Sequence, residues 1–374
     1  MKKLTIWALI LALLLTGCAP AEPAQSQNEW VPEQTMDLQF ATQFQVDYYS
    51  GGYKLISLAD GSKFLVVPEG CEVPENAPKD AVPLYQPIEN IYLAATSAMC
   101  LFDALDRLDA ITLSGSRAES WYIENAQKAM EAGDILYAGK YSEPDYEMLL
   151  SHHCPLAVES MMIGHASDVK QKLEELGIAV LTDQSSMEEH PLGRTEWIKL
   201  YAALLNEEDK AETLFQEQVA YLNEALKADS TGKTVAFFHI SSSGYVVARK
   251  SGDYVTKMLE LAGGKYVFSD LGDRETKTST VNIEMEQFFA AAKDADCIIY
   301  NSTIGGEIYT VEELLEKSPL LAQFKAVQTG NVWCTQKNMY QETTQLGQMI
   351  QSFRKIFSGE ADGLDTLPFL YRLQ

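Results

Sequence analysis

The sequence predicts an α/β protein with two Rossmann-like lobes, each a parallel-rich sheet flanked by helices, joined by one long α-helix. In residues 88–206 and again in 231–374, short apolar runs alternate with helical segments, a pattern typical of β-α-β units. Between them, residues 207–230 keep a helical period without a strand signal. A stretch of alternating apolar and polar residues adds a small β meander before the first lobe.

The first residues predict export and lipid anchoring. Lys2 and Lys3 precede an apolar run, Leu4 to Leu15, that is too short to span a bilayer and is typical of a signal peptide. Leu15, Thr16, Gly17 and Cys18 follow, and this sequence resembles a bacterial lipobox. The resemblance implies a signal peptide at 1–17, a lipid on Cys18, and a tether at 18–37. The alternative is an ordinary secretory signal with an incidental cysteine.

The mature chain is then predicted to begin with a β meander and a loop, residues 38–87. Apolar and polar positions alternate over residues 38–67, and Gly51-Gly52 and Asp60-Gly61 interrupt the runs, which predicts three antiparallel strands. Five prolines in residues 68–87 predict a connecting loop.

The first lobe, residues 88–206, is predicted from four apolar runs with helical stretches between them. The candidate strands are 91–95, 110–114, 156–160 and 178–182, and the candidate helices are 97–108, 119–132, 144–151 and 167–176. Residues 195–228 then show two apolar stripes at helical spacing, interrupted near Asn206. The second helix is expected to be about 30 Å long at 1.5 Å per residue, enough to cross from one lobe to the other.

The second lobe repeats the alternation. Its candidate strands are 233–241, 244–248, 296–302 and 330–335, and its candidate helices are 253–262, 284–293, 310–317 and 341–357. Gly263 and Gly264 are placed to end the first of these helices.

Composition and motifs exclude several classes of function. The chain has 29 Lys and Arg against 53 Asp and Glu, a formal charge of −24, which disfavours nucleic acid as a partner. The sequence has no Gly-x-Ser-x-Gly, phosphate-binding loop or His-Glu-x-x-His, so no enzymatic activity is predicted. The five cysteines after Cys18 are odd in number and lack Cys-x-x-Cys spacing, so we expect buried thiols rather than a disulfide framework.

One glutamate in each lobe occupies an equivalent position. Glu147 begins a short helical segment before the strand at 156–160, and Glu286 does the same before the strand at 296–302. At 100° per residue, each side chain is turned away from the buried stripe of its helix. The pattern fits either two functional surface acids or two ordinary first-turn glutamates.

The order of these features resembles the substrate-binding lipoproteins of ABC importers, in the class that carries iron–siderophores, haem and cobalamin. The resemblance covers about residues 88–357. The segments that carry it are Ala95-Thr96-Ser97-Ala98, Asp145-Tyr146-Glu147-Met148-Leu149-Leu150, Pro191-Leu192-Gly193-Arg194-Thr195-Glu196-Trp197-Ile198, Leu261-Ala262-Gly263-Gly264 and Phe324-Lys325-Ala326-Val327-Gln328-Thr329-Gly330-Asn331-Val332-Trp333. The chain departs from the family at His152-His153-Cys154-Pro155, where a Lys-Pro-Asp sequence is usual, and in its added meander.

The resemblance implies a function and partners. It implies capture of an iron(III)–siderophore-type complex between the lobes, with only modest closure because a helix joins them, and delivery to an ABC permease and its ATPase. Glu147 and Glu286 match the family's two docking acids. It also implies a monomer, held by the lipid on Cys18 at the outer face of the cytoplasmic membrane, on the cell surface or in the periplasm.

Ligand contacts are expected where the carboxyl ends of the parallel strands face one another. Aromatic rings and thioethers offer flat apolar contact, and arginines bind carboxylate or catecholate oxygens. Arginines can instead pair with nearby acids, and methionines can serve packing. The candidates are Thr96, Ser97, Arg117, Trp121, Met161, His165, Arg194, Tyr245 and Thr303, with Met162 and Tyr309 beside them.

Other ligands stay open. A corrinoid or haem fits the same fold, with His165 or His190 as an axial ligand or a contact to a chelate. The five histidines are dispersed along the sequence, so a free metal-ion binder is less expected, and no metal site or resident cofactor is predicted. An exported enzyme with its residues gathered only in space is the remaining alternative.

Overall fold

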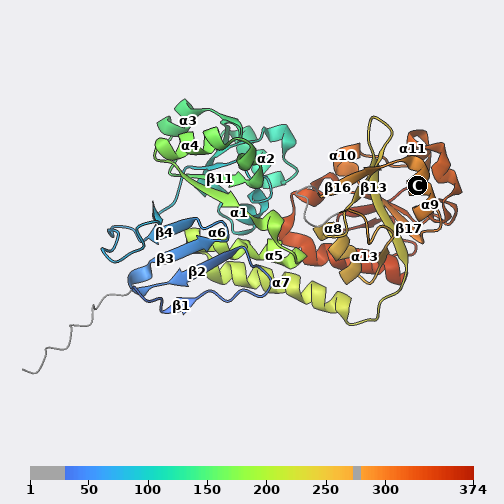
Figure 1. The fold of residues 1–374 in the computed structure, drawn as a ribbon, viewed down its shortest axis with the longest axis horizontal. Coiled ribbons are helices and arrows are strands. Elements are labelled where there is room, and N and C mark those ends of the chain that lie inside the picture. The colour runs from blue at the N-terminus through green and yellow to red at the C-terminus, as the bar shows by residue number, and fades with distance from the viewer. Residues whose placement is uncertain (1–29, 273–278) are drawn as a thin grey trace, which may run out of the picture.

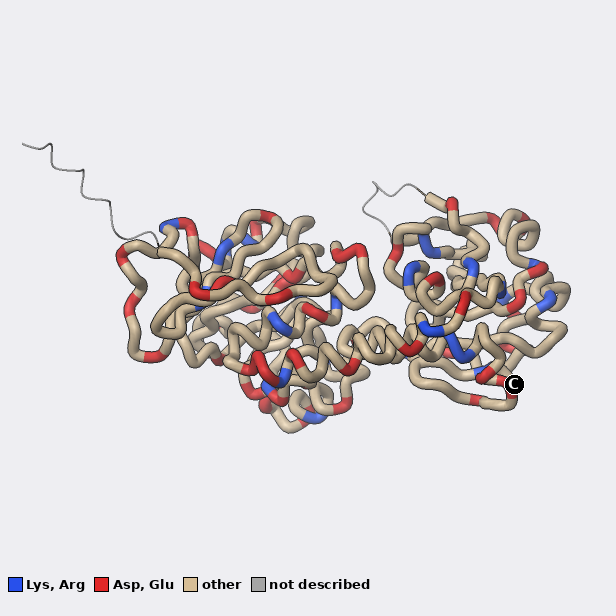
Figure 2. The backbone as a smooth tube through the Cα atoms, turned by 90° about the horizontal axis from the view of Figure 1, so that it is seen from below, with Lys and Arg blue, Asp and Glu red and all other residues tan. Residues whose placement is uncertain are grey.

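The computed structural model describes residues 30–272 and 279–374, and it consists of two α/β lobes with an N-terminal sheet beside the first lobe (Figure 1). The signal peptide, Cys18 and most of the tether lie outside the described residues. Viewed from below, α7 (Glu208–Leu226) runs from one lobe to the other, and acidic residues lie on both lobes (Figure 2). The predicted fold class is therefore confirmed.

The N-terminal sheet has five strands in the order β1-β2-β3-β4-β5. The predicted antiparallel meander corresponds to β2 (Phe44–Tyr48), β3 (Lys54–Leu58) and β4 (Lys63–Val67). Two strands depart from the prediction: β1 (Gln34–Thr35) lies within the expected tether, and β5 (Val82–Tyr85) lies within the expected proline-rich loop and pairs parallel to β4. Two residues are too few to give an alternating pattern, and Pro83 obscured the other strand.

The first-lobe sheet is parallel throughout, in the order β12-β11-β6-β7-β8. Its strands are β6 (Ile91–Leu93), β7 (Ile111–Ser114), β8 (Leu136–Tyr137), β11 (Leu156–Ser160) and β12 (Ala179–Asp183). Its helices are α1 (Met99–Ala104), α2 (Glu124–Ala132), α3 (Tyr146–Ser151) and α4 (Ser167–Glu175). A two-stranded ribbon, β9 (Gly139–Lys140) with β10 (Glu143–Pro144), precedes α3.

Residues 191–226 form three helices, where two had been predicted over residues 195–228. They are α5 (Pro191–Glu196), α6 (Ile198–Leu205) and α7. Pro191 starts α5 because proline is favoured at the first helical position, and Asn206 ends α6 in the left-handed conformation with φ 60°. The connecting helix α7 has 19 residues and ends at Leu226, earlier than the expected residue 230.

The second-lobe sheet has the order β16-β14-β13-β17-β18-β20-β19, with β15 beside β13. The strands β13 (Thr234–Ile240), β17 (Cys297–Tyr300), β18 (Val332–Thr335) and β15 (Lys265–Tyr266) are parallel. The antiparallel edges are β14 (Val246–Arg249), β16 (Thr280–Ile283), β20 (Leu370–Arg372) and β19 (Thr366–Leu367). Prediction missed β15, β16, β19 and β20.

The helices of this lobe cover its sheet and reach back to α7. They are α8 (Tyr254–Leu261), α9 (Met285–Ala292), α10 (Ser302–Gly305), α11 (Val311–Lys317), α12 (Lys325–Gln328) and α13 (Leu346–Ser358). The last begins later than the predicted residue 341, because Thr343–Gln345 forms a 3₁₀ turn. Gly347 allows α13 to lie against α7, since a Cβ there would collide with the carbonyl oxygen of Gln218.

One continuous apolar core joins the N-terminal sheet, the lobes and the connecting helices. It includes Val46 of β2, Phe102 of α1, Phe215 of α7 and Phe353 of α13, all 5% exposed or less. A second cluster, around Leu113, Ala157 and Leu173, lies on the other face of the first-lobe sheet. Because the core is shared through the hinge, large independent rotations of the lobes would expose apolar surface.

Candidate functional site

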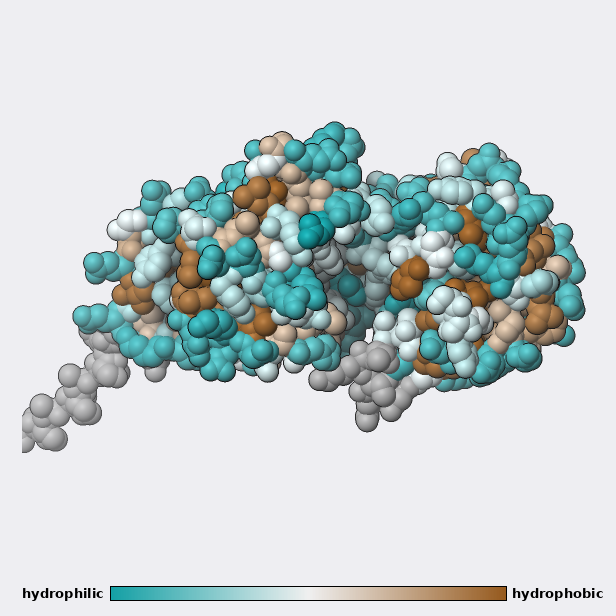
Figure 3. Space-filling view, turned by 90° about the horizontal axis from the view of Figure 1, so that it is seen from above, coloured by the Kyte–Doolittle hydropathy of each residue, from teal (hydrophilic) through white to brown (hydrophobic). Residues whose placement is uncertain are grey.

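The loops that follow the parallel strands of the two lobes meet across a cleft. Figure 3 shows this cleft from above as a hollow between the two bodies. At its seam, the Gln341 side chain donates from Nε2 to the Ser120 carbonyl oxygen (2.8 Å) and accepts at Oε1 from the Tyr122 amide (2.8 Å). Gln341 comes after β18 in the second lobe, whereas Ser120 and Tyr122 come after β7 in the first. The carboxyl edges of both sheets therefore border the same space.

A second contact between the lobes involves Arg194. This residue lies on α5, and its guanidinium carbon is 4.0 Å from the centre of the Tyr254 ring, at the start of α8. Nearby, the Thr195 hydroxyl donates to the carbonyl oxygen of Thr343 at 2.8 Å. Arg194 thus joins the lobes, and its π contact with Tyr254 covers one face of the guanidinium.

Large apolar side chains are exposed in segments that follow the strands of the two sheets. Exposed apolar groups of this size are informative when they gather in one region of a soluble protein. Each of the following belongs to a segment that comes after a strand of one of the two sheets: Tyr122, Met161, Met162, Met187, Tyr245, Ile304 and Tyr309. The predicted candidates Met161 and Tyr245 are among them, one from each lobe.

The predicted polar candidates occupy different environments. Thr96 is exposed and Ser97 is half-buried in the turn after β6. His165 is exposed at the end of the 3₁₀ turn Met161–His165. Thr303 is half-buried, and its hydroxyl donates to Asn301 Oδ1 at the start of α10. Arg117 is exposed, with its guanidinium carbon 4.2 Å from the centre of the Tyr137 ring.

Trp121 departs from the expectation that it offers a ring to the ligand. Its side chain is 2% exposed and belongs to the apolar core. Its indole Nε1 has no hydrogen-bond partner among the described residues. The sequence could not distinguish a ring on the cleft surface from a ring turned inward at the same loop position.

The second lobe contains a buried polar cluster that was not predicted from the sequence. Arg249, at the end of β14, donates to Asp253 Oδ2 and Ser279 Oγ, both at 3.3 Å, and to the Tyr340 hydroxyl. That hydroxyl also accepts from Asn301 Nδ2 at 2.9 Å. These residues come from four separate segments, so apart from the i, i+4 spacing of Arg249 and Asp253 no local signal reveals them.

Burial shapes the charges in this cluster. Burial opposes the charge on Arg249, but Tyr340 and Asp253 outweigh that effect and raise the pKa of the guanidinium. Burial also raises the pKa of the Asp253 carboxyl, which Arg249 only partly offsets. Burial, with Arg249, lowers the pKa of His239 at the end of β13. A neutral imidazole beside a permanent cation is therefore favoured at neutral pH.

A second missed group is the carboxyl of Glu159, at the end of β11. The residue is fully buried, and neither carboxyl oxygen has a hydrogen-bond partner among the described residues. Burial raises its pKa to about 8. The electrostatic neighbours of this carboxyl are the rings of Tyr92 and Tyr146. The run Leu156–Ser160 predicted a buried strand correctly, but it gave no reason to expect an unpaired acid inside it.

The two predicted docking acids are both exposed. Glu147 lies in the first turn of α3 and Glu286 in the first turn of α9. Each helix directly precedes a central parallel strand, β11 in the first lobe and β17 in the second. The two helices lie on different lobes, to either side of the cleft (Figure 1). The equivalent positions of the two glutamates in the sequence thus correspond to equivalent positions in the folds of the two lobes.

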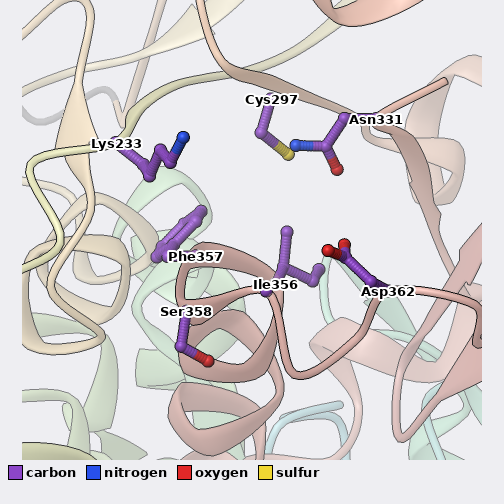
Figure 4. Close-up of a pocket in the computed structure, with 8 residues that line it drawn as sticks. Lys233, Cys297, Asn331, Ile356, Phe357, Ser358 and Asp362 are labelled. Atoms are coloured by element: carbon purple, nitrogen blue, oxygen red, sulfur yellow. The ribbon is translucent and has the colours of Figure 1, made fainter. Parts of the chain in front are cut away.

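Two pockets that are partly open to solvent lie away from the cleft. One, of about 280 Å³, is at the amino edge of the second-lobe sheet, where Lys233, Cys297 and Asn331 face Phe357 and Asp362 (Figure 4). The other, of about 260 Å³, is at the hinge between α1, α7 and α13.

Within the described part of the chain, no group of three or more His, Cys, Asp or Glu residues is arranged to hold a metal ion. Nor does any described helix have the length and apolar character needed to cross a membrane.

The sequence matches a known protein family and a related lipoprotein. The family model described as periplasmic binding protein matches residues 116–339, more than half of the chain. A lipoprotein of Methanocaldococcus jannaschii is 26% identical over 313 residues, which cover 79% of this chain and 73% of the relative. The match to the family begins after the N-terminal sheet, so that sheet lies outside it.

Solved structures resemble the fold at lower identity. A periplasmic binding protein from Veillonella parvula superposes with a TM-score of 0.61 at 17% identity and covers 85% of this chain and 98% of its own. The periplasmic haem-binding protein of Vibrio cholerae gives a TM-score of 0.57 at 19% identity, covering 70% and 97%. The Fe³⁺-hydroxamate transport protein of Saccharomonospora viridis gives 0.53 at 19% identity, covering 73% and 93%.

Proposed function

The chain belongs to the periplasmic binding protein family, and from that premise we propose that it captures an iron(III)–siderophore-type complex between its lobes and delivers it to an ABC permease. The observation that carries the proposal is the cleft between the lobes (Figure 3), bordered by loops that follow the parallel strands and carry exposed methionine, tyrosine and isoleucine side chains. A family of binding proteins requires no catalytic centre, and the sequence contains none of the catalytic motifs considered above.

The chemistry of the cleft fits a metal chelate. Such ligands have a broad organic frame around the metal and anionic oxygen donors at its surface. Met161 and Tyr245 supply apolar contact from the two lobes, and Arg117 supplies an exposed cation. Arg117 stacks on Tyr137, which holds the guanidinium in place while leaving its edge free to donate hydrogen bonds.

The resemblance to solved structures supports the same ligand class. Two of the structures compared above are described as a haem-binding protein and as part of Fe³⁺-hydroxamate transport. Both ligands are iron held by a larger organic molecule. The likeness at under 20% identity concerns the fold, so the choice of chelate has to come from the side chains of this cleft.

Haem or a corrinoid is the second candidate, and one observation favours it. Met161, Met162 and His165 lie in a single exposed 3₁₀ turn, and thioether sulfur and imidazole nitrogen are both haem-iron ligands. A flat macrocycle also suits a wall of methionines. Arg117 can bind the anionic oxygen donors of a siderophore or the carboxylates of haem, so the ligand panel below decides between the two candidates.

A thermal-shift panel separates these candidates. The purified chain is heated with a ferric trihydroxamate, a ferric tricatecholate, haemin and cyanocobalamin, each beside its metal-free form. A bound ligand at 100 times its Kd stabilises the fold by about 2.7 kcal/mol, so the true class raises the Tm by several degrees. We expect a shift with a ferric siderophore and little with the metal-free form. A shift only with haemin or cobalamin would move the assignment to the second candidate, and no shift with any would reject the proposal.

Delivery to the permease is assigned to Glu147 and Glu286. Both are exposed, in equivalent first turns on different lobes, and each is free to meet a basic residue on a membrane partner. The double variant Glu147→Ala, Glu286→Ala is expected to abolish uptake of radiolabelled iron chelate by cells while leaving the Kd in solution unchanged. The matched control is Glu189→Ala, Glu316→Ala, which removes two other exposed acids. Normal uptake in the first variant would remove the docking assignment.

Lipid anchoring at Cys18 completes the proposal. The relative from M. jannaschii is described as a lipoprotein, and the lipobox resemblance points to the same modification. We expect the Cys18→Ser variant to lose incorporation of labelled fatty acid and to leave the membrane fraction. Unchanged labelling in that variant would contradict the assignment.

A further inference from the structure

The loop between β1 and β2 presents five consecutive backbone amides to two buried carboxylates. We name residues 39–43 the N-terminal turn. The amides of Gln39, Phe40 and Ala41 donate to Glu196, each with one oxygen at 2.8 Å. The next two amides, of Thr42 and Gln43, donate to Glu188 at 2.9 and 3.1 Å. Both glutamates are less than 5% exposed.

The same carboxylates are tied to the connecting helices. Glu188 accepts from the Trp197 indole Nε1 at 2.9 Å, and Glu196 pairs with Lys199 at 3.1 Å. Lys199 in turn donates to the Asp37 carbonyl oxygen at 3.1 Å and pairs with Glu212 of α7 at 2.8 Å. The N-terminal turn therefore contacts α5, α6 and α7 through one buried charge network.

The N-terminal turn also packs directly on α5. The Phe40 ring stacks on His190 with their centres 4.2 Å apart. A Cβ at Gly193 would lie 3.0 Å from the Phe40 carbonyl oxygen, so the glycine allows the close approach of the two backbones. Both contacts are made just before Arg194 in the sequence, the residue that reaches Tyr254 in the second lobe.

A helix of six residues does not hold its own orientation. Isolated helices of this length are unstable, and their direction depends on what they pack against. The orientation of α5 decides where Arg194 projects, and Arg194 is one of the contacts between the lobes. We propose that Glu188 and Glu196 are positioning residues, through which the N-terminal turn holds α5 and sets the angle between the two lobes.

A separate contact supports this role for the N-terminal sheet. Lys54 of β3 donates from Nζ to the Ala203 carbonyl oxygen and to Asn206 Oδ1, both at 2.8 Å. It also pairs with Glu208 at the start of α7. The sheet thus holds both α5 and the junction from which α7 leaves. This inference goes beyond the proposed function, because it concerns the lobe angle and holds whatever the ligand is.

Amide hydrogen exchange offers a direct readout of the contact between the lobes. The Tyr122 amide is in the first lobe, and its acceptor is Gln341 of the second, so its protection depends on the seam being closed. In the full chain, Glu196→Ala is expected to accelerate exchange at Tyr122 and at the start of α8. Both sites lie outside the N-terminal turn and its sheet.

Three controls separate positioning from a loss of stability. Glu189→Ala removes an exposed acid next to Glu188 and is expected to change nothing. Val46→Ala weakens the core of the N-terminal sheet without touching the carboxylates and is expected to lower the Tm while Tyr122 keeps its protection. Glu196→Gln keeps an acceptor and should restore part of the protection. If Glu196→Ala does not fold, Glu188→Gln with Glu196→Gln takes its place, with the same expected direction.

The result that would overturn the inference is equally specific. One contradicting result is an unchanged exchange rate of the Tyr122 amide in Glu196→Ala. Another is an equal acceleration in Val46→Ala and Glu196→Ala when the two variants have the same Tm. Either result would show that the glutamates serve stability alone. No ligand is needed for this measurement, so its failure leaves the proposed function untouched, and failure of the thermal-shift panel leaves this inference untouched.

Discussion

The guanidinium carbon of Arg194 lies 4.0 Å from the centre of the Tyr254 ring, and this contact joins the hinge side of the first lobe to α8 of the second. Arg194 also favours the ionised form of the neighbouring Asp253 carboxyl. Together with the hydrogen bonds of Gln341, it joins the two lobes at the cleft. The arrangement of the two lobes around the cleft therefore depends on these few contacts as well as on the two sheets.

Removing the Arg194 side chain should loosen the seam. We expect Arg194→Ala to reduce the free energy of unfolding by about 1–2 kcal/mol, the range for a partly desolvated cation–π contact. Chemical denaturation measures the loss. The comparison is Arg117→Ala, whose stacking on Tyr137 lies within one lobe at an exposed site. An equal loss in both variants would mean that the contact between the lobes has no special weight.

Gln341 should bias the lobes toward closure. Gln341→Ala removes one donated and one accepted hydrogen bond, each worth about 1 kcal/mol net. The expected result is a larger radius of gyration in small-angle X-ray scattering, because more molecules adopt an open arrangement. Gln323→Ala, at an exposed position of the second lobe, is the control and should not change the radius. An unchanged radius for Gln341→Ala would contradict a role in closure.

Glu159 should make stability depend on pH. Burial raises its pKa from 4.5 to about 8, so between these values the folded chain keeps a proton that the unfolded chain releases. Its contribution to stability is present below pH 4.5 and is lost as the pH rises toward 8. Glu159→Gln removes this loss. The free energy of unfolding of the variant should therefore exceed that of the unchanged chain by a margin that grows to roughly 2–4 kcal/mol at pH 8. Denaturation at pH 4.5, 6 and 8 measures the difference, and a constant difference would contradict the assignment.

The buried Arg249 should be far more sensitive than any exposed arginine. Its removal leaves the Asp253 carboxyl buried without its partner, which typically costs about 3–5 kcal/mol. We expect Arg249→Ala to lower the free energy of unfolding by that amount, measured by urea denaturation. A loss under 1 kcal/mol would show that water or another donor replaces the guanidinium.

The sequence predicted the larger elements because their hydrophobic periods are long. The strand β11 was predicted at its observed bounds, Leu156–Ser160, since the apolar residues Leu156, Ala157 and Val158 follow Pro155. Helix α4 was predicted to within one residue. Short edge strands such as β19, with two residues, carry no period and were missed. The helix α5 was missed as a separate element because Pro191 and Gly193 resemble a turn.

The candidate site could be predicted only in part. Met161 and Tyr245 were predicted as candidates because they lie in loops that follow parallel strands, and both side chains are exposed in the structure. Tyr340 and Arg249 were not found, since they meet only when separate segments of the second lobe fold together. The Trp121 ring points into the core because of its side-chain torsion angles, and no sequence pattern specifies those angles. Glu188 and Glu196 were missed for another reason: their partners are backbone amides, which leave no trace in a sequence.

The most direct test of the account is a titration of the chain with its ferric chelate, followed by intrinsic fluorescence, in variants of each wall of the cleft. We expect one binding site per chain. We also expect that Arg117→Ala in the first lobe and Tyr245→Ala in the second each weaken binding by about tenfold or more, the effect of losing one contact of about 1.5–3 kcal/mol. Binding that is indifferent to one lobe, or absent altogether, would contradict a ligand held between the two.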